Sequence, residues 1–93
     1  MRLAAKRDKG ESEVVAALRA IGATVTPLSA TGVPDLLVGI AGHNVLLETK
    51  SAGETLTPAQ KRWHADWRGK AHVVYTVADA LMVAKHYMGR DRG

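Results

Sequence analysis

Three charged residues, Asp35, Glu48 and Lys50, lie in or beside two short apolar segments in the middle of this 93-residue chain. A charge left unpaired in an apolar sheet costs several kcal/mol, so such groups are usually paired or bind a metal ion. Carboxylate oxygens select Mg²⁺ or Mn²⁺, and such a cation lowers the pKa of a bound water and neutralises charge on a phosphate. Lys50 is no metal ligand, but it could orient the water or stabilise developing negative charge. These residue types predict a metal-assisted site.

The hairpin that must bring them together consists of two apolar runs, 35–40 and 44–49, joined by Ala41-Gly42-His43. A fold about residue 42 or 43 places Asp35 opposite roughly Thr49 or Lys50, and Glu48 shares a strand face with Lys50. We therefore expect the charged groups to converge at one end of the hairpin. Because both runs are nearly continuous in apolar residues, the sheet is expected to be covered on both faces.

A third acid comes from the first predicted helix, which spans about residues 8–21. Helical periodicity places Glu11 on the same arc as Val15 and Leu18, whereas Glu13 falls on the solvated side. Glu11 is therefore a candidate metal ligand or water-positioning base. In the alternative interpretation, Asp8 and Glu11 form a capping box that serves only the helix end.

The remaining elements follow from their start and stop signals. Gly22 ends the first helix, and Pro27 confines the strand at 23–28 to an edge or a strand end. Thr57-Pro58-Ala59-Gln60 is a capping box that opens a second helix, which runs to about Arg68 and ends at Gly69. A strand at 71–76 and a last helix from Val77, closed by Gly89, complete the chain. The order αβββαβα predicts a single α/β domain over residues 1–93, with a mixed central β-sheet flanked by helices.

At this point the strings GVPDLLVG and LLETKSAGETLTPAQKRWH resemble the VRR-NUC (virus-type replication-repair nuclease) branch of the PD-(D/E)xK nuclease superfamily. The signature is Pro34-Asp35 followed by Glu48-Thr49-Lys50. Four further features make the resemblance specific: Gly32 before Pro34-Asp35, Glu11 in the first helix, the polar loop after Lys50, and the capping box of the second helix. The resemblance extends from Glu11 to the strand that ends near Val77.

The resemblance implies a restriction-endonuclease-like core and an Mg²⁺- or Mn²⁺-dependent endonuclease. It makes Asp35 and Glu48 the metal-binding carboxylates, with the main-chain carbonyl of Thr49 as a further ligand and Lys50 as the catalytic lysine. Glu11 matches the first-helix acid of this branch and of archaeal Holliday-junction resolvases, and Gln60 matches a polar position near the site. Thr49 stands where an aliphatic residue is common, which affects only local packing.

Small stand-alone relatives of this kind, from phages and bacteria, look like homodimers that cut four-way junctions. The expected function is therefore a structure-specific DNA endonuclease of DNA repair that acts on branched DNA such as Holliday junctions, with no small-molecule substrate. Two alternatives stay open: a nuclease for flaps, nicks or single strands, and a non-catalytic DNA-binding module that retains the fold.

Composition is consistent with a DNA partner. Thirteen Lys and Arg residues against nine Asp and Glu residues give a net charge of +4, which suits a polyanion. The candidate phosphate contacts are Lys6, Arg7, Lys9, Lys61, Arg62, His64 and Arg68. The absence of cysteine excludes disulfides and thiolate metal sites. No apolar run approaches the ~20 residues of a membrane span, and no signal peptide is recognisable. We therefore expect a cytoplasmic protein of a bacterial or phage-infected cell.

Two tryptophans, Trp63 and Trp67, lie four residues apart on the second predicted helix. Packing in the core or in a dimer is the favoured interpretation, because a stacking platform for bases requires exposed rings. No pair of histidines has convincing zinc-site spacing.

Overall fold

The computed structural model describes residues 9–90 of the chain. Its seven elements confirm the predicted order, and they are α1 (Lys9–Ala20), β1 (Thr24–Pro27), β2 (Leu36–Ile40), β3 (His43–Thr49), α2 (Pro58–Asp66), β4 (Ala71–Val74) and α3 (Val77–Arg90). Within these described residues, no helix is both long and apolar enough to cross a lipid bilayer.

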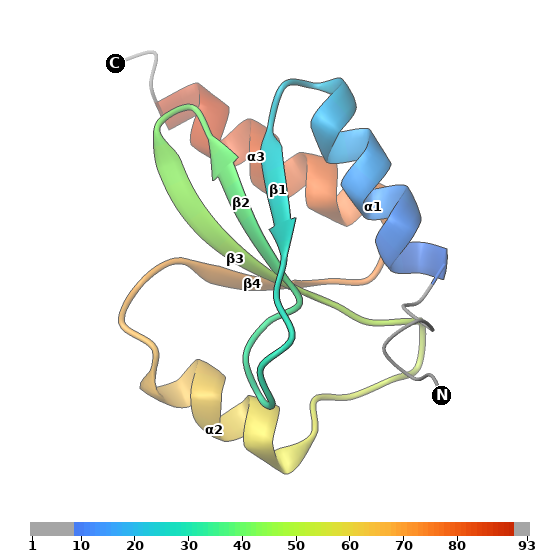
Figure 1. Cartoon of the computed structure of the whole chain (residues 1–93), viewed down its shortest axis with the longest axis vertical. Coiled ribbons are helices and arrows are strands. Elements are labelled where there is room, and N and C mark those ends of the chain that lie inside the picture. The colour runs from blue at the N-terminus through green and yellow to red at the C-terminus, as the bar shows by residue number, and fades with distance from the viewer. Residues whose placement is uncertain (1–8, 91–93) are drawn as a thin grey trace.

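The four strands form one mixed sheet in the order β1-β2-β3-β4 (Figure 1). β1, β2 and β3 pair antiparallel, whereas β3 and β4 are parallel and are connected through α2. A parallel pair needs such a crossover, because the chain must return to the same end of the sheet. Pro27 is the last residue of the edge strand β1, as its missing N–H predicts.

The turn between β2 and β3 sets the register of the hairpin. Ile40 pairs with His43, so the turn consists of Ala41 and Gly42, and both have positive φ angles, 50° and 82°. Positive φ at both central residues is the geometry of the tight hairpin turns that match strand twist. The expected turn centre at residue 42 or 43 is therefore wrong, because the turn is centred between Ala41 and Gly42. The ladder ends with Leu36 opposite Leu47, so Asp35 comes opposite Glu48 rather than Thr49 or Lys50.

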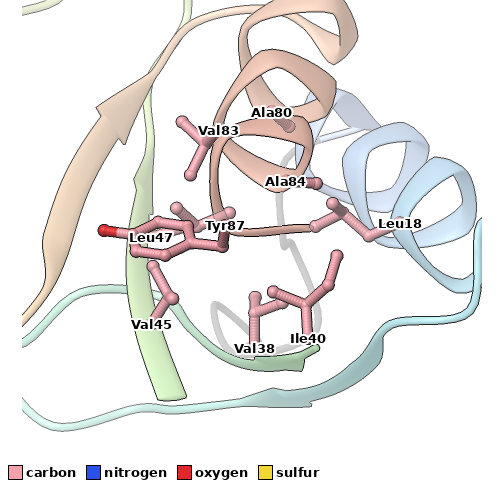
Figure 2. A pocket seen from close by; sticks show the side chains of 9 residues that line it. All are labelled: Leu18, Val38, Ile40, Val45, Leu47, Ala80, Val83, Ala84 and Tyr87. Carbon is pink, nitrogen blue, oxygen red and sulfur yellow. The ribbon is translucent and has the colours of Figure 1, made fainter. Parts of the chain in front are cut away.

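The core lies between one face of the sheet and the helices α1 and α3. Val14 and Leu18 of α1, together with Ala80 and Ala84 of α3, are buried against the strands. Figure 2 shows α3 and Leu18 of α1 closing over strand residues such as Leu47. The cavity left between these side chains measures only about 10 Å³ and is lined almost wholly by apolar atoms. It is too small and too apolar to hold a ligand.

The opposite face of the sheet is more open than expected. In Figure 1, α2 stands apart from the layer formed by α1 and α3. None of its residues is buried, and Leu37 of β2 is 38% exposed. The continuous apolar runs therefore do not indicate a sheet covered on both faces. Of the two expected environments of Trp63 and Trp67, the core is wrong, whereas packing in a dimer stays a prediction.

Two helix ends differ from those expected. α2 ends at Asp66, with Trp67 as its extended C-cap, and not at Gly69. Gly69 serves close packing instead, since a Cβ there would lie 2.7 Å from the indole Nε1 of Trp67. Gly89 lies inside α3, which continues to Arg90, so it does not close that helix. Gly22, with φ of 98°, does end α1 as expected.

Candidate active site

Asp35 and Glu48 come together where β2 and β3 separate. They follow the last pair of the ladder, Leu36 with Leu47, whose side chains are buried on the core side. Because successive side chains alternate across a strand, Asp35 and Glu48 both lie on the other face. Their carboxyl groups are close enough to hydrogen-bond once one of them is protonated. Two acids in this position form a potential cation site.

Thr49 holds the carboxylate of Asp35 with two donors. Its main-chain N–H and its hydroxyl group both donate to Asp35 Oδ2, each over 2.9 Å. In a strand, the N–H and C=O groups of one residue point toward the same neighbour, so the Thr49 carbonyl faces the Asp35 side as well. The hydroxyl bond was not predicted from the sequence. The signal for it was a polar residue at a position where an aliphatic one is common.

Gln60 at the start of α2 holds Glu48. Its Nε2 donates to Glu48 Oε2 over 3.2 Å. The predicted capping box fixes Gln60 at the same time: the Thr57 N–H donates to Gln60 Oε1 over 2.9 Å, and the Gln60 N–H donates to the Thr57 hydroxyl. The two predicted roles of Gln60, helix capping and a place at the site, are thus both present in the structure.

A close contact fixes the loop before Asp35 against the same helix. Gly32 has φ of 80°, and a Cβ at this position would lie 3.4 Å from the Cβ of Ala59. A glycine therefore allows both the left-handed backbone and the close approach to α2. This packing brings the Pro34-Asp35 segment and the first turn of α2 to the same end of the hairpin.

The Glu48 carboxyl group is buried, with 1% of the residue exposed. Its second oxygen, Oε1, is buried and accepts no hydrogen bond from the described residues. The pKa of Glu48 is raised from 4.5 to about 8, mainly by burial and then by the neighbouring Asp35 carboxyl group, whereas Lys50 opposes the rise. Glu11 contributes the smallest upward effect on this pKa. Without a cation, Glu48 therefore carries a proton at neutral pH.

Glu11 and Lys50 meet beside this pair, around a cavity of about 40 Å³. Its lining includes Ser51 and Tyr75, which the sequence analysis did not single out. Glu11 is 6% exposed and projects from the first turn of α1. The structure thus places five of the predicted site residues at one end of the sheet: Glu11, Asp35, Glu48, Lys50 and Gln60.

The donor set fits a hard divalent cation held partly by water and substrate. The unpartnered buried Oε1 of Glu48 needs a positively charged or hydrogen-bonding neighbour, and the Asp35 carboxylate is adjacent to Glu48. Across residues 9–90, no three His, Asp or Glu side chains group closely enough to enclose a metal ion. Mg²⁺ suits such a partial set, because it usually keeps several waters and takes only one or two carboxylates.

The predicted DNA-contacting residues are distributed unevenly. Lys6 and Arg7 lie outside the described residues, as does the side chain of Lys9. Those on and just after α2 are exposed: Lys61, Arg62 and Arg68. His64 is half-buried, its Nε2 is buried with no hydrogen-bond partner in the described part of the chain, and burial lowers its pKa. The neutral His64 ring therefore differs from the exposed cations around it.

Comparisons with known proteins agree with this architecture. A solved structure described as a VRR_NUC domain superposes on the chain with a TM-score of 0.72. The two chains are 26% identical, and the match covers 85% of this chain and 94% of that one. No family model and no curated protein matches the sequence. The fold resemblance expected from the sequence is confirmed.

Proposed function

We propose that this chain, which has the fold of a VRR-NUC nuclease domain, is a metal-dependent endonuclease that hydrolyses phosphodiester bonds in DNA. The observation that carries the proposal is the pair formed by the buried Glu48 and the neighbouring, half-buried Asp35. One Glu48 oxygen is held by Gln60, and the other is buried without a hydrogen bond from any residue between 9 and 90. A purely structural pair of acids has no need for this arrangement, because burial and the neighbouring Asp35 carboxyl group both disfavour the charged form of Glu48.

Each residue then has a defined part in the reaction. Asp35, Glu48 and the carbonyl of Thr49 would hold Mg²⁺ or Mn²⁺, which when bound supplies an activated water and neutralises charge on the phosphate. Thr49 and Gln60 fix the two carboxylates from behind through the bonds described above. Lys50 stabilises the negative charge that develops on the phosphate oxygens. Glu11, across the small cavity from Lys50, would position the attacking water.

Cleavage of labelled DNA tests this proposal. Linear duplex, flap and four-way-junction DNA are incubated with Mg²⁺, with Mn²⁺ and with EDTA. Wild-type protein is expected to cut only with a divalent cation, and Asp35→Ala to be inactive. Lys50→Ala should lose at least 100-fold in rate, as for removal of one charge-stabilising donor, but still bind DNA. Lys85→Ala, an exposed lysine on α3, is the matched control and should cut normally.

DNA binding without cutting, unchanged in Asp35→Ala and Lys50→Ala, would contradict the enzyme assignment and favour a binding module. Cutting that persists in EDTA would contradict the metal site.

The substrate that we propose is branched DNA, with a symmetric four-way junction such as a Holliday junction cut by a homodimer. A two-fold dimer presents two equivalent sites to two symmetry-related strands. The open sheet face with its exposed Leu37 offers surface for such an interface. Light scattering of the protein alone should give twice the chain mass, and paired symmetric cuts should appear in the junction. A monomer that cuts flaps faster than junctions would contradict this substrate.

A further inference from the structure

Trp63 and Trp67 form a stacked pair on α2, outside the core. Their ring centroids are 4.8 Å apart with an angle of 18° between the planes. Trp67 is 44% exposed, and no residue of α2 is buried. Core packing therefore does not explain why two large apolar rings stand here. The condition for a base-stacking platform, an exposed ring, is met.

The pair is aligned with the candidate active site. Gln60, which holds Glu48, Trp63 and Trp67 are spaced at i, i+3 and i+7 along α2 and its C-cap. This spacing places them on one face of the helix. At 1.5 Å per residue, the exposed ring lies about 10 Å along the axis from Gln60. A DNA strand whose phosphate lies at Glu48 would thus pass the tryptophans.

The surroundings of the rings are positively charged. Three exposed cations lie on α2 and just after it, against the single acid Asp66: Lys61, Arg62 and Arg68. The ammonium of Lys70 lies elsewhere, 2.6 Å from His43 Nδ1 and over the Tyr87 ring. Interleaved cations and aromatic rings bind single-stranded nucleic acid, because the cations follow the backbone while the bases stack. A charged face of this kind complements DNA better than it complements the similarly basic surface of a second copy.

Trp67 is also fixed in place before any ligand binds. Trp63 lies against its ring, and the backbone at Gly69 comes so close that a Cβ there would lie 2.7 Å from Nε1. A ring that is already ordered loses little side-chain entropy when a base stacks on it. A fixed, exposed indole beside a basic helix is suited to a planar partner.

We propose that unpaired DNA bases next to the cleaved phosphate stack on the Trp63–Trp67 pair. The inference rests on the proposed function and adds to it that the branched substrate presents unpaired bases beside the cleaved phosphate, as where base pairs open at the centre of a junction. The stacked bases position the single-stranded segment of the DNA. The end of this segment where base pairing begins then lies at Glu48, to which Gln60 of the same helix donates a hydrogen bond.

Intrinsic fluorescence tests this directly, because the chain contains two tryptophans and both belong to the pair. Wild-type protein is titrated in EDTA with single-stranded oligothymidylate and with a duplex of equal length. The single strand should quench the fluorescence and protect it from acrylamide, and the duplex should do so more weakly. Equal quenching and protection by both DNAs would overturn the inference.

Three variants separate stacking from structure. Trp67→Ala should weaken single-strand binding by roughly 5- to 100-fold, the range for loss of one base stack, while Trp67→Phe should restore most of the affinity. Met82→Ala, on the 70% exposed position of α3, is the control and should bind normally. Affinity unchanged in Trp67→Ala would overturn the inference. If circular dichroism shows that Trp67→Ala is unfolded, Trp67→Phe and the wild-type protection measurement decide.

Two outcomes distinguish this inference from the proposed function. Stacking and single-strand preference without metal-dependent cutting of any DNA would contradict the nuclease and uphold the platform. Metal-dependent cutting with no effect of Trp67→Ala on affinity would uphold the nuclease and overturn the platform. Protection of the tryptophans that rises with protein concentration, without DNA, would show that a second copy covers the pair and would overturn the platform too.

Discussion

Asp35 and Glu48 face each other across the end of the β2–β3 ladder, one step beyond the pair Leu36–Leu47. Thr49 donates hydrogen bonds to Asp35, and Gln60 donates one to Glu48. The two acids therefore cannot move apart without breaking these hydrogen bonds. The protein keeps the pair together in spite of its electrostatic cost, which a proton on Glu48 or a bound cation relieves.

The raised pKa of Glu48 predicts a pH dependence of folding stability. Its pKa is about 8 in the fold against 4.5 ordinarily, so between these values the folded protein holds one more proton than the unfolded chain. The free energy of unfolding should therefore fall as the pH rises from about 4.5 to 8. One pKa unit corresponds to about 1.4 kcal/mol, so Glu48 accounts for a loss of a few kcal/mol, measurable by urea unfolding.

Glu48→Gln provides the comparison, because it keeps the shape and removes the titration. Its stability should vary less with pH than that of the wild type and exceed it at pH 8. All other residues are the same in the two proteins, so their effects cancel in the difference. Saturating Mg²⁺ should also reduce the pH dependence of the wild type, because the cation displaces the proton. Identical pH profiles for the two proteins would contradict the assigned pKa.

The hydroxyl group of Thr49 should contribute to metal affinity through Asp35. Thr49→Val keeps the β-branched shape and the N–H bond but loses the hydroxyl bond to Oδ2. We expect Mn²⁺ binding, measured by calorimetry, to weaken by about 10- to 100-fold, as for other residues that orient a metal ligand. Thr24→Val, on the exposed edge strand, is the matched control. Equal Mn²⁺ affinities in both variants would show that the hydroxyl is only structural.

The two roles of Gln60 can be separated by substitution. Gln60→Glu keeps the acceptor for the Thr57 N–H, and so the capping box, but loses the donor to Glu48. The new carboxyl group lies against Glu48 and Asp35, so repulsion should lower the melting temperature without metal, and saturating Mn²⁺ should restore it. Thr57→Ala should instead lose about 1 kcal/mol of stability both with and without Mn²⁺. A melting temperature of Gln60→Glu that matches the wild type without metal would make Gln60 a capping residue alone.

Much of the fold could be predicted because local signals agree with it. The capping box at Thr57 and Gln60, the stop at Gly22 and the edge position of Pro27 all lie where the structure has them. The hairpin register could not be predicted, because Ala41 adopts a positive φ that L-residues rarely take. From the sequence, a turn formed by Gly42 and His43 is therefore as plausible as the observed turn of Ala41 and Gly42. The resulting shift places Glu48, and not Lys50, opposite Asp35.

The features that could not be predicted depend on tertiary packing. The apolar runs of β2 and β3 do not reveal that α2 leaves the second face of the sheet open. The sequence shows that a strand is hydrophobic, but it does not show which element packs on each face of that strand. The same limit applies to Trp63 and Trp67, whose large apolar rings suggested burial. Asp35 and Glu48 still come together, because the hairpin brings their two segments to one end of the sheet whichever residue centres the turn, although a shift of one residue changes which side chains share a face.

The central claim is a divalent cation held between Asp35 and Glu48. Crystals soaked in Mn²⁺ test it most directly, through an anomalous difference map. The account predicts one strong peak within bonding distance of both carboxylates and the Thr49 carbonyl, absent from crystals of Glu48→Gln. A map with no peak there, or with the manganese bound at another site while Asp35 and Glu48 stay in contact, would contradict it.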